Sequence, residues 1–122
     1  MAVSTPAPDL GKPCPDFLLP GVDGRTYALR DFASSRCLLV VFTCNHCPYA
    51  RAVEDRIIAL QRDYQPSALQ VVAVCANDAV AYPDDARPKL AERWRDKQMP
   101  YPYLHDEAQE VARPFGAVCP PD

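Results

Sequence analysis

The sequence lacks the features that mark several specialised classes of protein. It has no run of five or more basic residues and a formal net charge of −3, so the basic footprint of a nucleic-acid-binding protein is absent. No apolar stretch approaches the ~20 residues that a membrane-spanning helix requires. The N-terminus has no basic segment followed by an apolar one, as a secretory signal would have. We therefore expect a cytoplasmic protein without a nucleic-acid or membrane partner.

The sequence also lacks an internal repeat and any sign of a second domain. Its 122 residues suffice for one domain and are too few for two. Apolar residues make up 48% of the chain, which is ordinary for a globular core. We expect a single domain over residues 1–122, with a flexible, proline-rich segment at residues 1–13.

Cysteine is not scarce, but the chain does not resemble a small secreted disulfide scaffold. Six cysteines occur among enough Val, Leu and Ile to build a core, and free cysteine often behaves as a small hydrophobic residue. Cys37 and Cys75 stand in apolar, strand-like runs. We therefore expect most of the six to be reduced core thiols and look for one special pair.

The periodicity predicts alternating strands and helices. Apolar runs without alternation are typical of parallel strands covered on both faces. Apolar residues at steps of three and four indicate helices. The predicted order is two short strands forming a hairpin (15–19 and 25–29), a helical turn (30–35), a strand (38–42), a helix (48–64), a strand (69–76), a helix (86–98), a short strand (99–104) and a helix (106–115). This order favours an α/β fold with parallel strand pairing.

Several side chains have simple structural interpretations. In the first helix we expect an apolar face formed by Tyr49, Val53, Ile57, Leu60 and Tyr64, and a solvated face that includes Glu54, Asp55 and Arg56. We expect Asp84-Asp85 to cap the following helix, and Leu90 and Trp94 to share one of its faces. His105 is interpreted as a solvated loop residue. Asp106 and Gln109 resemble a capping box, and Gly116 a helix C-terminal residue.

The motif Cys44-Asn45-His46-Cys47 lies between the predicted strand 38–42 and the helix that follows it. Two cysteines three apart on a helical turn can form a disulfide. A helix N-terminus favours an anion, so we expect a lowered pKa for Cys44. Its thiolate would attack a disulfide and the second thiol would resolve the mixed disulfide. His46 would stabilise the thiolate and make the pair more oxidising.

Two other interpretations of the motif stay open. Zinc usually requires a second Cys/His pair, and no second Cys-x-x-Cys exists; His46 could be a third ligand, with Cys14 or Cys119 as the fourth. The two cysteines could also be inert core residues. Covalent haem attachment needs His directly after the second cysteine, where Pro48 stands.

At this point the residues resemble a known family. The segments Gly11-Lys12-Pro13-Cys14-Pro15-Asp16-Phe17, Asp23-Gly24 and Tyr27-Ala28-Leu29-Arg30-Asp31-Phe32 resemble the N-terminal signature of the alkyl hydroperoxide reductase/thiol-specific antioxidant (peroxiredoxin-like) branch of the thioredoxin superfamily. The segment Cys44-Asn45-His46-Cys47-Pro48-Tyr49 is similar to a bacterial Cys-Asn-His-Cys-Pro subgroup. Further matches are Asn77-Asp78, Tyr82-Pro83-Asp84, Pro102-Tyr103-Leu104, Asp106-Glu107 and Gln109-Glu110-Val111-Ala112.

The resemblance implies a thioredoxin-like fold with an N-terminal β-hairpin extension. It implies that Cys44 is the nucleophile, Cys47 the resolving thiol and Pro121 a cis-proline opposite the pair. Cys119 would lie close by. We interpret it as a small packing residue, and the alternative is a third redox thiol.

The sequence departs from the family pattern in several places. Thr43 replaces the tryptophan that often precedes the first cysteine, Val41 stands where many thioredoxins carry a buried acid, and Pro120 replaces a threonine. The family continues past the cis-proline with a hairpin and a helix, whereas this sequence stops at Asp122. We therefore expect a C-terminally truncated chain whose strand 38–42 has an open edge, through which a homodimer could form.

The leading functional hypothesis is thiol–disulfide exchange at Cys44 and Cys47, without a bound cofactor or metal. The partners would be a disulfide-containing protein or small molecule and a cellular thiol reductant. A peroxiredoxin-like thiol peroxidase is the alternative, although the Pro-x-x-x-Thr-x-x-Cys pattern is absent: Leu39 stands four residues before Thr43, and Cys47 comes one position late. A redox-inactive interaction module is the third hypothesis.

Overall fold

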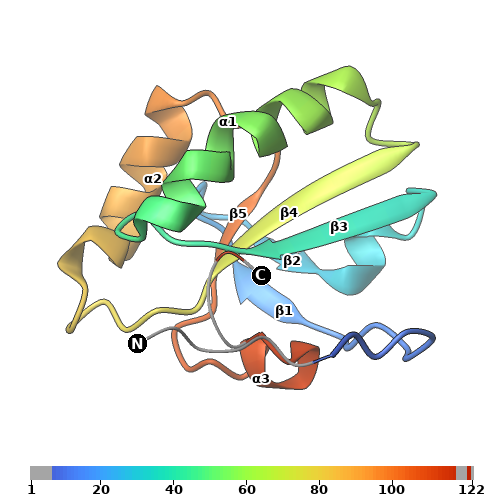
Figure 1. Cartoon of the computed structure of the whole chain (residues 1–122), viewed down its shortest axis with the longest axis horizontal. Helices are drawn as coiled ribbons and strands as arrows, with labels where there is room; N and C mark the ends of the chain where they lie inside the picture. The colour runs from blue at the N-terminus through green and yellow to red at the C-terminus, as the bar shows by residue number, and fades with distance from the viewer. Residues whose placement is uncertain (1–6, 118–120, 122) are drawn as a thin grey trace.

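The computed structural model describes residues 7–117 and residue 121, and shows an α/β fold (Figure 1). Its elements are β1 (Leu18–Pro20), β2 (Thr26–Ala28), β3 (Cys37–Phe42), α1 (Pro48–Asp63), β4 (Leu69–Cys75), α2 (Arg87–Asp96), β5 (Tyr103–His105) and α3 (Ala112–Phe115). Short 3-10 turns cover Leu29–Phe32 and Pro83–Asp85. The order of elements predicted from the sequence is confirmed.

The central sheet is parallel and has the order β3-β4-β5 among the described residues. Its register pairs Val41 with Ala73 and Ala73 with Tyr103. Helices α1 and α2 cover one face of the sheet, and β1 and α3 lie on the other (Figure 1). Because both faces are covered, β4 is almost wholly apolar and is buried from Val71 to Cys75.

The N-terminal hairpin packs beside β5. Strands β1 and β2 are antiparallel, with Leu19 opposite Tyr27, and Gly24 turns the chain with a φ of +86° that few other residues adopt. The hairpin then joins the main sheet, because the amide of Val22 donates to the Tyr103 carbonyl at 2.9 Å. The predicted hairpin is thus confirmed. Residues 7–13 are exposed and form neither helix nor strand, and residues 1–6 lie outside the described part.

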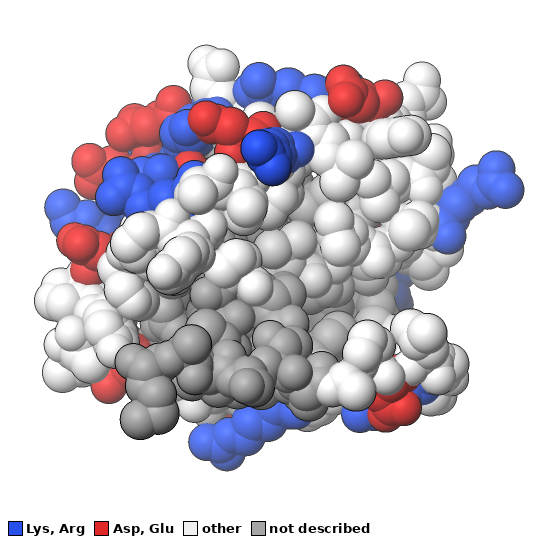
Figure 2. Space-filling view, in the orientation of Figure 1, with Lys and Arg blue, Asp and Glu red and all other residues white. Residues whose placement is uncertain are grey.

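Strand β3 is hydrogen-bonded on one side only within the described residues. A hollow of about 780 Å³ runs beside it, with Leu38, Leu39 and Val40 in its wall. The described part of the chain therefore has the open strand edge that we expected. Asp16, Arg30 and Arg36 also line the hollow, and further charged side chains gather along α1 and α2 (Figure 2).

The buried face of α1 differs from the predicted one. Its buried residues are Ala50, Glu54, Ile58 and Gln61, whereas Tyr49 is 77% exposed. The prediction was wrong at Tyr49 and Tyr64, which are exposed, and right at Ile57, which packs partly buried against the core. Two polar side chains share the buried stripe with Ala50 and Ile58. Gln61 accepts a hydrogen bond from the Val71 amide at 2.6 Å and donates to the Leu69 carbonyl at 2.8 Å.

Glu54 is likewise not on a solvated face. Its carboxylate receives a forked pair of hydrogen bonds from Arg93 of α2, with Nε and Nη2 of the arginine 2.8–3.1 Å from its oxygens. Paired in this way, the carboxylate is buried at 7% exposure. This ion pair holds α1 against α2.

The last helix is shorter than predicted and begins at Ala112. The expected capping box at Asp106 and Gln109 was wrong, because Val111 is the N-cap and the helix has no side-chain cap. The Asp106 carboxylate accepts from the amides of Val111 and Ala112, and the side chain of Gln109 donates to the Ala76 carbonyl. Gly116 ends the helix with a φ of +74°. None of the described helices combines the length and apolar character needed to cross a membrane.

Candidate functional site

Both cysteines of the motif precede α1. After β3 the chain turns at Thr43, and Cys44 is buried at 1% exposure. Cys47 is the residue before the helix and is half-buried, and Pro48 begins the helix. We had expected Cys44 to lie at the N-terminus of the helix, and this prediction was wrong. The Cys44 sulfur instead accepts a hydrogen bond from the Cys47 amide.

The pKa of the Cys44 thiol is raised, whereas we had expected it to be lowered. Burial raises this pKa to about 11. The hydrogen bond from the Cys47 amide opposes the rise, the negative charge of Asp85 adds to it, and a hydrogen bond from the Asn77 side chain lowers the pKa least. A thiol removed from water holds its proton because the anion loses its hydration. In this reduced state, Cys44 is therefore mainly a thiol at neutral pH.

Asp85 is the residue around which the motif is organised. Its carboxylate is fully buried, at 0% exposure. Oδ1 accepts from the amides of Asn45 at 2.7 Å and His46 at 3.2 Å, and Oδ2 accepts from the side chain of Asn77 at 3.1 Å. Oδ2 also contacts Nδ1 of His46. A buried carboxylate is stable only with such partners.

The expected capping role of Asp85 was therefore wrong. The residue before α2 is Ala86, and the helix has no side-chain cap. Asp85 points away from the helix that it precedes and fixes the loop between the two cysteines. Many thioredoxins carry a buried acid where this chain has Val41. In this chain a buried acid, Asp85, lies beside the motif but comes from the segment between β4 and α2.

His46 is held from two sides. Its ring stacks on that of Tyr82, with centroids 4.2 Å apart and planes 5° from parallel, and its Nδ1 contacts Asp85. The side chain is 32% exposed. His46 therefore joins the buried carboxylate to the molecular surface.

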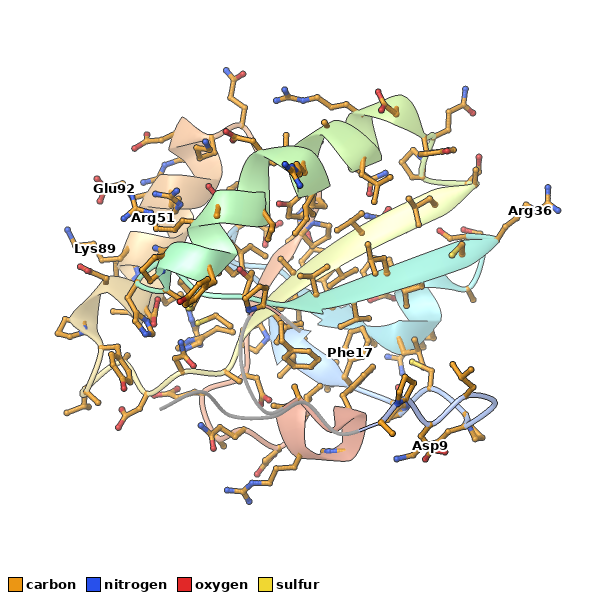
Figure 3. The ribbon with its side chains drawn as sticks, viewed as in Figure 1. Asp9, Phe17, Arg36, Arg51, Lys89 and Glu92 are labelled. Atoms are coloured by element: carbon orange, nitrogen blue, oxygen red, sulfur yellow. The ribbon has the colours of Figure 1, made fainter. Side chains whose placement is uncertain are left out.

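Asn45, the other residue between the cysteines, attaches the motif to the second helix. Its side-chain amide donates to the carbonyls of Asp84 and Lys89, both at 3.0 Å. Beside it lies a polar hollow of about 250 Å³, whose wall includes Arg51 and Lys89. Figure 3 shows Arg51 of α1 and Lys89 and Glu92 of α2 near one another in this region.

A mixed set of donor atoms meets at the motif. The sulfur of Cys44, a ring nitrogen of His46 and a carboxylate oxygen of Asp85 all lie within 4.8 Å of one another. Thiolate, imidazole and carboxylate are the ligands that zinc takes in proteins. The zinc interpretation from sequence included His46 but looked for Cys14 or Cys119, and Cys14 is exposed while Cys119 lies outside the described residues.

The remaining cysteines follow the expectation only in part. None of the five cysteines that the structure describes is joined in a disulfide. Cys75 is a core thiol at 0% exposure, and burial raises its pKa to about 12. Cys37 is exposed, so its assignment to the core was wrong.

His105 is buried, contrary to the expected solvated loop. It is the last residue of β5, at 4% exposure, and its ring nitrogens have no hydrogen-bond partner among the described residues. Burial, and then the charge of Arg87, lowers its pKa. Pro121 is exposed; Pro120 lies outside the described residues, so the role of Pro121 stays a prediction.

Sequence reasoning placed Cys44, His46 and Cys47 at one site, and the structure brings them together. It missed Asp85, Asn77 and the stacking of Tyr82 on His46. The sequence analysis named Asn77-Asp78 and Tyr82-Pro83-Asp84 as matches to the family pattern and gave them no role in the site. No spacing rule relates them to residues 44–47, because the contact forms only when β4 lies beside β3.

Comparisons with known proteins agree with this description. The AhpC/TSA family model matches residues 10–122. A hypothetical protein from Sinorhizobium meliloti is 34% identical, with a TM-score of 0.92 over 96% of this chain and 64% of its own. An uncharacterized conserved protein from Geobacillus kaustophilus is 38% identical, with a TM-score of 0.90 over 98% and 62%. The chain thus spans less than two thirds of either structure.

More distant structures share the fold. A thiol:disulfide interchange protein of the thioredoxin family from Chlorobium tepidum has a TM-score of 0.73 at 19% identity, covering 95% of this chain and 74% of its own. The thioredoxin-like fold is therefore shown. Comparison with curated proteins gave no significant match.

Proposed function

Because the chain belongs to the AhpC/TSA family, we propose that it is a thiol–disulfide oxidoreductase whose redox pair is Cys44 and Cys47. The observation that carries this proposal is the cluster at the end of β3. There, two cysteines three residues apart lie beside a buried carboxylate that is hydrogen-bonded to the loop between them.

The proposed reaction transfers two electrons to a substrate disulfide. The Cys44 thiolate attacks one substrate sulfur, and the other leaves as a thiolate that takes up a proton. The Cys47 thiolate then attacks the Cys44 sulfur of the mixed disulfide. The first substrate sulfur leaves as the second thiol, and the protein ends with a Cys44–Cys47 disulfide. A cellular thiol reductant returns the pair to the dithiol.

The difference in burial sets a condition on this order of attack. Cys44 is buried and Cys47 half-exposed, so a substrate sulfur reaches Cys44 only after the loop moves. The Cys44 proton must also leave, and His46 and Asp85 each place a titratable atom within 4.8 Å of its sulfur. We propose that the Asp85–His46 pair receives this proton and carries it towards solvent.

The raised pKa of Cys44 changes the direction of electron transfer that we expect of the Cys44–Cys47 pair. Thiolate stabilisation makes a disulfide more oxidising, and here burial destabilises the thiolate. We therefore propose that the pair acts as a reductant, in place of the oxidant that His46 alone suggested. Such a protein suits the reducing cytoplasm.

The hollow between α1 and α2 is our candidate for the substrate contact. It adjoins Asn45 of the motif, and charges of both signs line it, including Arg51, Lys89 and Glu92. We further propose that a second copy of the chain pairs along the open edge of β3. Its apolar wall and its unpaired backbone would be covered in such a dimer.

A redox titration tests the main proposal. The protein is equilibrated in glutathione buffers, alkylated, and analysed by peptide mass. We expect Cys44 and Cys47 to convert together as one two-electron couple, with Cys14→Ser behaving as the wild type. If the two cysteines never pair, the proposal fails. A hydroperoxide consumed faster than a disulfide substrate would favour the peroxidase instead.

A trapping experiment tests the order of attack. With Cys47→Ser, a mixed disulfide should accumulate on Cys44. If it accumulates only on Cys47 of the Cys44→Ser variant, then Cys47 attacks first and the assigned roles are reversed.

A further inference from the structure

We infer that the reduced motif is also a zinc site, with Cys44, His46 and Asp85 as its protein ligands. The inference goes beyond disulfide exchange, because it needs the same sulfur but no electron transfer. It starts from three donor atoms of different chemistry that lie within 4.8 Å of one another. No spacing in the sequence connects Asp85 with the cysteine motif.

The separations fit a metal with small movements. Zinc bonds are about 2.3 Å to sulfur and about 2.0–2.2 Å to nitrogen or oxygen, and tetrahedral geometry places the donors roughly 3.3–3.6 Å apart. Separations of up to 4.8 Å need to close by at most roughly 1.2–1.5 Å, while the direct contact of His46 with Asp85 must open to admit the ion. Cys47 or water would complete the tetrahedron.

The surroundings of the donors support the assignment. Asp85 is oriented by the Asn45 and His46 amides and by the Asn77 side chain, which is the kind of second layer that holds a metal-binding carboxylate in place. The 32% exposure of His46 leaves the cluster accessible from solvent. An ion would also bring a double positive charge to a buried carboxylate.

The chemistry balances without an oxidant. Zinc replaces the thiol proton of Cys44, so one proton is released and a sulfur–zinc bond forms. When Cys44 and Cys47 form a disulfide, the thiolate ligand is lost and zinc dissociates. This last step rests on the proposed function, and it would make zinc binding and disulfide exchange exclude each other.

The test uses the reduced, chelator-treated chain without oxygen. Zinc is titrated in competition with a chromophoric chelator, and cobalt serves as the spectroscopic probe. We expect one zinc per chain and a sulfur-to-cobalt charge-transfer band. Cys44→Ser should reduce that band by at least half and abolish it where water is the fourth ligand, and Asp85→Asn should weaken zinc binding roughly tenfold or more. Asp84→Asn and Cys14→Ser are matched controls that should bind as the wild type does.

Several results would overturn the inference. They are the absence of stoichiometric zinc, equal weakening in the controls, or unchanged affinity in Asp85→Asn while circular dichroism shows it folded. If Asp85→Asn does not fold, His46→Gln replaces it, with the same expected loss. Disulfide exchange is measured separately in chelator: zinc binding without exchange refutes only the proposed function, and exchange without zinc binding refutes only this inference.

Discussion

Replacing Asp85 by asparagine removes one buried negative charge while nearly preserving shape. The amide oxygen can still accept from the Asn45 and His46 backbone. The new NH2 group, however, faces the side chain of Asn77, which donates to Asp85 in the native protein. It also faces Nδ1 of His46. At Asn77 a donor thus meets a donor and that hydrogen bond is lost, and the charge that attracts the His46 ring is removed.

The expected cost follows from these contacts. A hydrogen bond to a charged group contributes about 1.5–3 kcal/mol, and a buried pair that loses one partner costs about 3–5 kcal/mol. Since Asn keeps half of the contacts, we expect Asp85→Asn to lower the unfolding free energy by about 2–4 kcal/mol. Asp84→Asn is the control, because the Asp84 side chain is exposed and should change stability by less than about 0.5 kcal/mol.

The same substitution should also change the thiol, which a purely structural residue would not do. Asp85 raises the pKa of Cys44. Two unit charges at the outer limit of 4.8 Å interact by about 3.5 kcal/mol at an effective dielectric constant of about 20, before the hydrogen-bond partners of Asp85 weaken its field. We expect the pKa of Cys44 to fall from about 11 by roughly one to two.

Urea denaturation of the reduced proteins and the rate of Cys44 alkylation against pH measure the two effects. In Asp85→Asn the alkylation profile should move to lower pH, while the profile of Asp84→Asn should not move. Should both the midpoint and the alkylation profile of Asp85→Asn coincide with those of the wild type, the role we assign to this carboxylate would be refuted.

Three further predictions concern residues outside the motif. Glu54→Gln should lower the unfolding free energy by about 3 kcal/mol, because Arg93 loses a buried partner. The control Asp55→Asn, at a side chain 79% exposed, should change the unfolding free energy little, and equal urea midpoints for the two variants would contradict this prediction. Burial lowers the pKa of His105 below its ordinary 6.5, so the unfolded state binds a proton first and stability should fall as pH drops below about 6.5. Unfolding curves of wild type and His105→Phe should therefore diverge at acid pH, and parallel curves would show that His105 is not responsible. Cys37→Lys, at the exposed start of the β3 edge, should shift a dimer to monomer in sedimentation experiments under reductant, and a monomeric wild type would refute the edge pairing.

Local sequence determined the order of elements and the location of the redox motif. The apolar run at Leu38–Phe42 and the one at Leu69–Cys75 predict buried parallel strands without reference to anything distant, since each pattern is complete within a few residues. Pro48 and Gly116 mark helix ends through their own backbone preferences. Residues 44–47 are likewise close in sequence, and the pair could be named from spacing alone.

Tertiary structure decided everything that depends on contacts across the sheet. Glu54 was assigned to solvent because a glutamate on a helix is usually exposed, yet the Arg93 guanidinium, 39 residues away, makes its burial possible. His105 looked like a loop residue and became the buried end of β5 when that strand paired with Cys75.

The active-site chemistry shows the same division. The motif alone suggested a lowered thiol pKa, because a helix N-terminus attracts anions. The pKa is instead set by how deeply Cys44 is buried and by Asp85, 40 residues beyond Asn45. Desolvation and the charge of a distant residue exist only once the chain is folded, so sequence determined which atoms react, and packing determined their protonation.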